Sequence, residues 1–280
     1  MAFQVTMPTG FIVEAQAFNN KTRQILRDRV LAGSGSTLLA IAKEASVTVA
    51  SPGPYAGGAD PQGGKLGEQV VGRAPNWEEV AFVDLATFLT RVRARVRGEH
   101  WFNHQCEYCQ HTNEMSVDLS KIVHKPMSEE GIRHLTDGVP IQRTIAYEDP
   151  DTKDVVEVNL DIVIQRGKFS RRIAGQQRRD VKAVPDFVAA NQILRARLHG
   201  GLELDTDDEI LEWYLKQPWD FTELFTEQLN EILGGADSTV EGTCENCSAA
   251  IEGRWGFDFP FFYPQKPKSA GARRRAARSM

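Results

Sequence analysis

Apolar residues recur at helical spacing over residues 77–97, and this is the clearest helical pattern in the chain. The apolar positions that fall on one face are Ala81, Leu85, Phe88, Leu89, Val92 and Val96. Asn76 is a suitable N-cap, Glu79 stands at the capping-box position, and Gly98 follows the last turn. The pattern therefore predicts an amphipathic helix from Asn76 to Gly98. Arg91, Arg93, Arg95 and Arg97 lie largely on the other face, which indicates a solvated surface or, alternatively, a surface for an acidic partner.

Other helices are predicted before and after this one. Residues 19–46 are expected to form two short helices, because residues 33–36 (Gly-Ser-Gly-Ser) interrupt their apolar pattern. Three late helices are expected at residues 186–198, 207–216 and 221–233, the last with Asp220 as its N-cap. The acidic residues Asp205, Asp207, Asp208 and Glu209 suit the start of a helix, so we assign them to capping rather than to a cation site.

Alternation of apolar and polar residues predicts strands in the middle of the chain. Residues 156–165 alternate over a strand-like run, and residues 141–147 are the expected partner strand. The intervening residues 149–154 (Asp-Pro-Asp-Thr-Lys-Asp) have turn chemistry. A further short strand is expected at residues 114–119. Together with the helices, these strands indicate an α+β protein.

The four cysteines of the chain form two pairs of identical spacing, Cys106-x-x-Cys109 and Cys244-x-x-Cys247. Two residues between thiolates allow one turn to present both sulfurs to one metal, and two such knuckles complete the tetrahedral shell of Zn²⁺. Residues 110–243 lie between the pairs, so the site must form in the tertiary structure. We therefore predict mixed helices and a β-hairpin around a zinc-ribbon-like site made of two distant knuckles. A filled shell leaves no position for substrate, so this zinc would be structural.

Other uses of the cysteines remain open at this point. A redox dithiol favours a helix start behind the first cysteine, and neither pair is followed by one in the sequence. Disulfides are disfavoured by a cytoplasmic location, and buried free thiols are a further alternative. His104 and His111 flank the first pair, but four cysteines already satisfy the metal.

The cysteine pairs and the turn-rich stretches suggest a domain organisation. We expect an N-terminal arm with short helices at residues 1–50 and a Gly/Pro-rich linker at residues 51–75. A zinc-stapled core would follow at residues 76–264, with an insert at residues 120–240, and then a basic disordered tail at residues 265–280.

Composition and charge narrow the range of possible functions. The chain has 280 residues and a net charge of −5, so nucleic-acid binding would have to be local, through residues 166–182 or the tail. No apolar run is long enough to span a membrane, and the N-terminus lacks a secretory signal, which predicts a cytoplasmic protein. The sequence contains no nucleophile elbow, phosphate loop, dinucleotide fingerprint or HExxH helix. We therefore expect neither an enzyme nor a small-molecule substrate.

Aromatic residues are concentrated beyond the second cysteine pair, at residues 255–263. Some are expected to pack on the zinc site. The others are candidates for an anchor that binds a partner protein, with packing in the protein's own core as the equal alternative. These candidate partner-binding residues are Phe259, Phe261, Phe262 and Tyr263.

The order of these features resembles a known family over residues 77–264. The features are the helix that ends at residues 91–98, the two cysteine pairs, Val117-Asp-Leu119, the late helices and Phe261-Phe262. They are similar to the baseplate hub assembly proteins of contractile-tailed phages and related contractile injection systems. Gln110 and Ser248 depart from the pattern, because such knuckles often carry glycine there.

The resemblance implies a non-enzymatic role, either in building the hub of a tail baseplate or as its assembly chaperone. The implied partners are other tail and baseplate proteins. The implied location is the cytoplasm of the host or producing cell during assembly, or the finished particle. A zinc-ribbon nucleic-acid-binding protein that uses residues 166–182 and the basic tail is the alternative, and a thiol oxidoreductase is the third hypothesis.

Overall fold

The structure, a computed structural model, describes residues 2–56, 69–150, 152–180, 184–198, 200–257 and 259–262. Its mixture of helices and antiparallel strands confirms the predicted α+β class. Much of the predicted linker (residues 57–68) and the whole predicted tail (residues 265–280) lie outside the described residues.

The chain forms two compact units, and their boundaries differ from the predicted domains. Unit 1 comprises Met1–Leu89 and Val123–Ala236, and unit 2 comprises Thr90–Ile122 and Asp237–Met280. The N-terminal residues expected to form a separate arm therefore belong to the same unit as most of the predicted insert. The cysteine pairs belong to the smaller unit 2.

The first part of unit 1 is a three-stranded antiparallel sheet with helices. The strands, in the order β1-β2-β3, are β1 (Phe3–Thr6), β2 (Ile12–Ala15) and β3 (Ser46–Ser51). The helices between β2 and β3 are α1 (Asn20–Arg27), α2 (Arg29–Ser34) and α3 (Thr37–Ala45). Short helices were predicted here, whereas the three strands were not.

Aromatic packing explains why this part joins the core of unit 1. Phe11 is fully buried, and its ring meets the edges of Tyr55 and Trp77 at centroid distances of 5.3 and 6.0 Å. Tyr55 ends the short 3₁₀ helix η1 (Gly53–Tyr55), and Trp77 also packs on Phe88. Burying several large rings together is a strong apolar contribution to stability. The N-terminal sheet is therefore part of a shared core.

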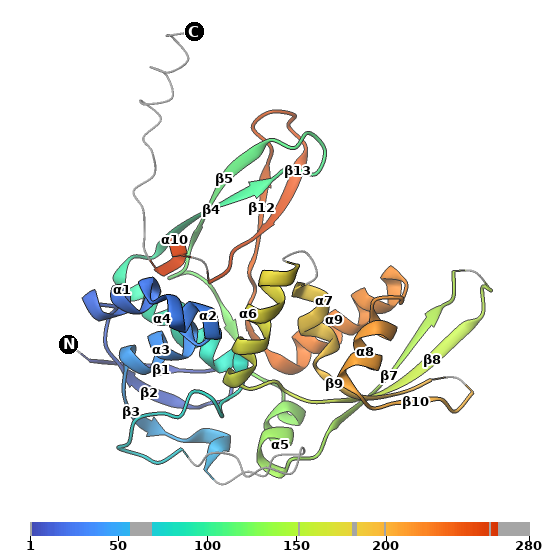
Figure 1. The fold of residues 1–280 in the computed structure, drawn as a ribbon, viewed down its shortest axis with the longest axis horizontal. Coiled ribbons are helices and arrows are strands. Elements are labelled where there is room, and N and C mark those ends of the chain that lie inside the picture. Colours follow the sequence, from blue (N-terminus) through green and yellow to red (C-terminus); the bar gives the residue numbers. More distant parts are fainter. Residues whose placement is uncertain are drawn as a thin grey trace. The chain divides into compact units, whose positions relative to one another are not determined.

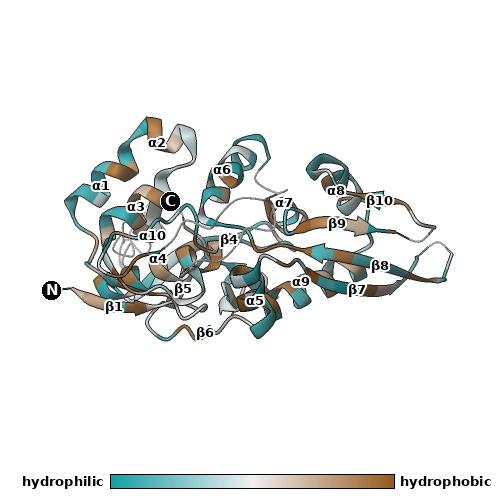
Figure 2. Ribbon diagram, turned by 90° about the horizontal axis from the view of Figure 1, so that it is seen from below, coloured by the Kyte–Doolittle hydropathy of each residue, from teal (hydrophilic) through white to brown (hydrophobic). Residues whose placement is uncertain are grey.

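A four-stranded antiparallel sheet forms the second part of unit 1, in the order β10-β9-β8-β7. The predicted hairpin is confirmed as β7 (Ile141–Glu148) and β8 (Val155–Ile162), in which Ile141 pairs with Ile162. Figure 2 shows hydrophobic and hydrophilic residues alternating along these strands. The remaining strands are β9 (Ile193–Arg197) and β10 (Glu203–Leu204). The prediction of a helix over residues 186–198 is thus wrong in its second half, because α7 (Val184–Ala190) ends before β9.

Helices cover this sheet, and short elements connect them (Figure 1). The helix α8 (Asp207–Tyr214) contacts β9, and α9 (Trp219–Leu233) contacts β7. Both were predicted, but α9 has Pro218 rather than Asp220 at its N-cap. The other elements are α5 (Glu129–Asp137), η2 (Gly167–Phe169), α6 (Ser170–Arg179) and the strand pair β6 (His124–Lys125) with β11 (Gly235–Ala236).

The helix α4 (Phe82–Val96) begins five residues later than the predicted first helical residue, Trp77. The backbone before it pairs with another segment instead: Phe82 N–H donates to Gln165 C=O (2.7 Å), and Gly167 N–H donates to Val80 C=O (2.8 Å). A side chain at Gly167 would overlap the carbonyl oxygen of Trp77, so this approach requires glycine. The helical start signals at Asn76 and Glu79 are therefore overridden by tertiary hydrogen bonds.

Unit 2 consists mainly of two β-hairpins. The first is β4 (Glu99–Gln105) with β5 (Thr112–Asp118), and the second is β12 (Thr239–Thr243) with β13 (Ala250–Arg254). The strands β5 and β12 are in contact. Side chains at Gly242 and Gly253 would press on Met115, so these glycines let the hairpins approach closely. The strand after the first knuckle was predicted, and the other three strands were not.

Candidate metal centre

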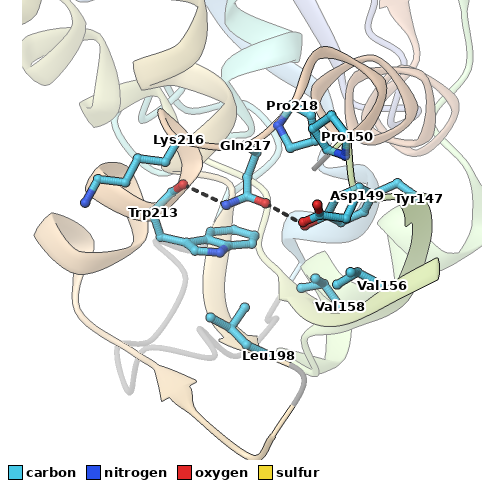
Figure 3. Close-up of a pocket in the computed structure, with 10 residues that line it drawn as sticks. All are labelled: Tyr147, Asp149, Pro150, Val156, Val158, Leu198, Trp213, Lys216, Gln217 and Pro218. Carbon is cyan, nitrogen blue, oxygen red and sulfur yellow. Dashed lines mark hydrogen bonds between the residues drawn. The ribbon is translucent and has the colours of Figure 1, made fainter. Parts of the chain in front are cut away.

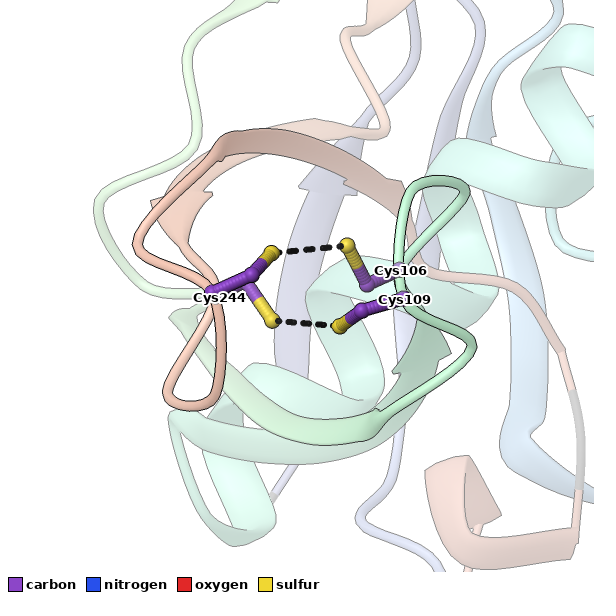
Figure 4. Close-up of side chains that lie close together, drawn as sticks. Cys106, Cys109 and Cys244 are labelled. Atoms are coloured by element: carbon purple, nitrogen blue, oxygen red, sulfur yellow. Dashed lines mark hydrogen bonds between the residues drawn. The ribbon is translucent and has the colours of Figure 1, made fainter.

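The two cysteine pairs meet at the tips of the hairpins in unit 2 (Figure 4). The Sγ atom of Cys106 lies 3.7 Å from that of Cys247, and the Sγ atom of Cys109 lies 3.6 Å from that of Cys244. All four Sγ atoms lie within 4.8 Å of one another. The predicted convergence of the two distant knuckles is confirmed.

These distances fit tetrahedral coordination of a zinc ion. Sulfurs held at about 2.3 Å from zinc in a tetrahedron are about 3.8 Å apart, close to the Cys106–Cys247 and Cys109–Cys244 separations. A disulfide needs about 2.05 Å between its sulfurs, and all four cysteines are free thiols. Four thiolates are also a donor set typical of structural zinc. The arrangement is thus compatible with a metal centre.

The two knuckles have matching backbone geometry. The amide of Gln110 donates to the carbonyl of Cys106 (2.9 Å), and the amide of Ser248 donates to the carbonyl of Cys244 (3.0 Å). Gln110 and Ser248 each have a φ of 59°, in the left-handed region that favours glycine. Each knuckle is therefore closed by the same tight turn, which directs both of its sulfurs to one side.

Asn113, on β5, links the two knuckles and was not singled out in the sequence. Its side chain is buried, with Nδ2 lying 3.6 Å from the Sγ atom of Cys244 and Oδ1 accepting a hydrogen bond from the Glu245 amide (2.9 Å). The only sequence signal for it is the alternation of β5, in which Asn113 and Met115 are the buried positions. Asn113 thus fixes the second knuckle against the first hairpin.

The cysteine thiols of the cluster differ in pKa. Backbone amides, first that of Cys247 and then that of Asn246, lower the pKa of the Cys244 thiol to about 6. The Ala249 amide acts to lower the pKa of Cys247, but the sulfurs of Cys109, Cys244 and Cys106, together with desolvation, raise it to about 12. Four adjacent thiolates therefore repel one another, and a divalent cation among them would remove this conflict.

The flanking histidines do not join the cluster. In the described part of the chain, the group of potential metal ligands contains the four cysteines and neither His104 nor His111. Strands also follow both pairs, since β5 begins at Thr112 and β13 at Ala250. Neither pair thus has the helix that lowers the pKa of a redox-active CxxC cysteine.

The candidate anchor residues are partly core residues. Phe261 and Phe262, in α10 (Phe259–Phe262), are 0% and 5% exposed. Phe261 stacks on Trp255 and meets the edge of His100, both in unit 2. The anchor hypothesis is therefore corrected for Phe261 and Phe262, because buried rings cannot insert into a partner. The side chain of Phe259, and Tyr263 as a whole, lie outside the described residues.

One of the arginines predicted on the solvated face of α4 is also in the core. Arg93 is fully buried, and its guanidinium donates to the carbonyl oxygens of Phe261, Arg97 and Glu99. Burial, and then the charge of Arg97, lower its pKa to about 10. Arg93 therefore joins the end of α4 to the closing segment of unit 2.

Within the described residues 166–180, the basic segment forms folded elements of unit 1 and several of its charges are paired. Arg166 is buried, and residues 170–179 form α6. Lys168 pairs with Glu79, and Arg171 and Arg172 pair with Glu78 and Asp207 at 2.5 and 2.9 Å. Much of its positive charge is therefore neutralised within unit 1. Residues 181–183 lie outside the described residues.

In comparisons with known proteins, no family model, no curated protein and no solved structure matches this chain. Among the described residues, no helix is both long and apolar enough to span a membrane. The function is therefore argued from the site and the sequence pattern.

Proposed function

We propose that Cys106, Cys109, Cys244 and Cys247 hold one structural zinc ion that fastens the two hairpins of unit 2 together. The observation that supports this is the position of four sulfurs within 4.8 Å of one another, brought from two distant parts of the chain. Four protein ligands fill a tetrahedral shell, so such an ion has no open position for water or substrate. Its contribution is stability rather than chemistry.

The surrounding residues suit this role. The left-handed turns at Gln110 and Ser248 aim each pair of sulfurs, and Asn113 holds the second knuckle through Cys244 and Glu245. Such groups around a metal site orient its ligands and raise metal affinity. When bound, the zinc would supply the positive charge that lets all four thiols ionise.

We further propose that the protein is a non-enzymatic structural or assembly component of a contractile phage tail or injection-system baseplate hub. The resemblance over residues 77–264 supports this role. A zinc-fixed pair of hairpins would provide a rigid surface for other tail proteins, because binding surfaces built on rigid elements lose less entropy on association. Assembly would take place in the cytoplasm of the producing cell.

Metal analysis and affinity purification test these two proposals separately. We expect elemental analysis of freshly purified protein to give one zinc per chain, and a Cys106→Ser, Cys244→Ser double variant to give none. Tagged protein from cells that produce tails should co-purify with baseplate proteins, and the double variant should co-purify with far less of them. Glu107→Gln, at an exposed position of the first knuckle, is the matched control and should keep both the metal and the partners.

Different results would reject different parts of the proposal. Metal-free protein with a reversible dithiol-disulfide couple would reject the zinc site and favour an oxidoreductase. Zinc-loaded protein that captures no tail component would reject the baseplate role and leave the zinc site intact.

The nucleic-acid alternative has less support than it had from sequence. The ion pairs of Lys168, Arg171 and Arg172 leave less free positive charge in residues 166–180. That alternative would then depend mainly on the basic residues after Lys266. Binding to DNA or RNA that weakens steeply with salt, and that is lost when those residues are replaced, would revive it.

A further inference from the structure

A pocket lies in unit 1, at the end of the four-stranded sheet (Figure 3). Its volume is about 350 Å³, which is within the range of ligand-binding pockets. The apolar part of its wall comes from Val156, Val158, Leu198, Trp213 and Pro218. They come from β8, the residue after β9, the helix α8 and the α8–α9 connection, so one cavity gathers apolar side chains from separate elements.

Hydrogen bonds connect residues of the pocket wall. Tyr147, at the end of β7, donates its hydroxyl to Oε1 of Gln217 (2.9 Å), and Nε2 of Gln217 donates to the carbonyl of Trp213 (3.0 Å). Phe221, at the start of α9, packs its ring against both Tyr147 and Trp213. The walls are therefore fixed by contacts of the folded protein, and the pocket is preformed.

Exposed apolar residues also adjoin the lining residues in the sequence. Trp219, which follows the lining residue Pro218, is 77% exposed. Leu215, next to the lining residue Lys216, and Leu202, whose carbonyl accepts from the Leu198 amide (2.8 Å), are also more than half exposed. A rim of large exposed apolar side chains is a mark of an interaction surface.

The helices α8 and α9, on either side of the lining residues Lys216, Gln217 and Pro218, carry mostly acidic charge. Between Glu203 and Glu231, Lys216 is the only basic residue, and every acidic residue is exposed. These acidic residues are Glu203, Asp205, Asp207, Asp208, Glu209, Glu212, Asp220, Glu223, Glu227 and Glu231. Some of them are neutralised by ion pairs, such as Asp207 with Arg172 and Glu212 with Lys216. The remaining charge attracts a basic partner and repels an acidic one.

We infer that this pocket and its rim bind a basic peptide segment of another protein, with one large aliphatic or aromatic side chain inserted into the pocket. The cavity accepts the apolar anchor, the exposed rim covers the residues beside it, and the acidic helices α8 and α9 attract the flanking Lys and Arg residues. This combination of a central anchor and a charged surround is typical of protein interfaces. The inference goes beyond the proposed function and does not depend on the metal centre, which belongs to unit 2.

Other occupants fit less well. Nucleic acid would be repelled by the acidic surroundings. A small polar metabolite would find two of the polar lining residues already engaged, because Gln217 bonds to Tyr147 and Trp213, and Oδ1 of Asp149 accepts from the Thr152 amide (2.9 Å). A peptide uses both the cavity and the exposed rim.

Labelled synthetic peptides test the inference on the full chain. The probe is a nine-residue peptide with a central leucine flanked by Lys and Arg, compared with a serine-centred version and a version flanked by Glu. In fluorescence anisotropy at near-physiological salt, we expect the leucine-centred basic peptide to bind at least tenfold more tightly than both others. Val156→Lys, which places a charge in the pocket, and Trp219→Ser, on its rim, should each weaken that binding at least fivefold.

A control at a distant surface residue distinguishes binding at this site from non-specific binding to exposed apolar residues. Val30→Ser, on α2, replaces an apolar side chain that is 79% exposed and should leave the affinity unchanged. Equal binding of the leucine- and serine-centred peptides would overturn the inference, because charge alone would then explain the binding. Unchanged affinity in both pocket variants would also overturn it. Tighter binding after Arg273, Arg274 and Arg275 are replaced by Glu would show that the chain's own tail is the occupant instead.

Discussion

Two residues carry backbone strain at the candidate metal centre. Gln110 and Ser248 both have a φ of 59°, although a non-glycine residue in the left-handed region costs about 1–2 kcal/mol. Each follows the second cysteine of its knuckle, where the chain must turn sharply to bring both sulfurs to one side. The conformation is therefore imposed by the site, and glycine at either position would relieve the strain.

Ser248→Gly is accordingly predicted to stabilise unit 2. The relief of the left-handed strain exceeds the added entropy of glycine in the unfolded chain, so we expect a gain of about 0.5–1 kcal/mol. Chemical denaturation of the zinc-loaded protein measures it, and competition with a zinc chelator should show tighter metal retention. The matched control is Ser116→Gly on β5, which has no positive φ and should lose about 0.5–1 kcal/mol. Equal effects of the two substitutions would show that the strain at Ser248 is not released.

A buried carboxylate in unit 1 joins three segments. The Oδ2 atom of Asp84, in the first turn of α4, accepts hydrogen bonds from the hydroxyls of Thr9 (2.6 Å) and Tyr55 (2.5 Å), and Asp84 is fully buried. Desolvation raises the pKa of Asp84 from 3.8 to about 6, although the hydrogen bonds from Thr9 and Tyr55 act to lower it. Burial is therefore the larger effect.

This shift predicts a pH dependence of stability. Because the folded-state pKa of Asp84 lies above its unfolded value, its stabilising contribution is full below about pH 4 and is lost as the pH rises through 6. Urea unfolding of the wild type and Asp84→Asn should therefore show the wild type losing about 1.4 kcal/mol relative to the variant between pH 5 and 7.5. Metal loss at acidic pH affects both proteins and cancels. The exposed Asp154→Asn should show a constant difference, and a constant difference for Asp84→Asn as well would contradict the prediction.

At the scale of elements, the sequence predicts what local pattern determines. The hairpin β7–β8 and the helices α8 and α9 are found close to their predicted positions, because their apolar periodicity and turn residues act within a few positions of one another. The cysteine pairs are equally predictable from the sequence, since each knuckle is a local motif. Their pairing across residues 110–243 followed from chemistry, because one zinc needs four ligands.

The elements that were missed depend on distant partners. Residues 193–197 resemble the end of a helix in sequence, but they pair with β8, and Arg197 forms an ion pair with Asp161 at 2.7 Å. The strands β1–β3 are short, and Phe11, just before β2, packs on Trp77 far along the chain. Asn113 was missed for the same reason, because its role depends on the position of the second knuckle. Tertiary contacts decided these positions over local propensity.

At the scale of the whole molecule, the two units differ in how their cores are built. Unit 1 has aromatic clusters and a four-stranded sheet, whereas unit 2 has two hairpins and a few buried side chains, such as Phe102, Met115 and Ile251. Domains below about 70–80 residues seldom gain enough stability from an apolar core alone and often use a metal. Metal binding should therefore be a larger part of the stability of unit 2.

Removal of the proposed zinc ion is predicted to loosen unit 2 selectively. Zinc binding stabilises only conformations that bring the four sulfurs together, so a chelator should open the hairpins β4–β5 and β12–β13. We expect hydrogen exchange followed by mass spectrometry to show at least a tenfold faster exchange at residues 99–118 and 239–254 in the chelated protein. The hairpin β7–β8 of unit 1 is the internal control and should exchange at an unchanged rate.

The same measurement on Cys106→Ser, Cys244→Ser separates the loss of metal from any direct action of the chelator. The double variant should exchange as fast as the chelated wild type in unit 2, and adding chelator to it should change nothing, because no ion remains to be removed. Re-addition of zinc should restore slow exchange in the wild type only. If unit 1 opens together with unit 2, the metal supports the whole core, and the two units do not unfold independently.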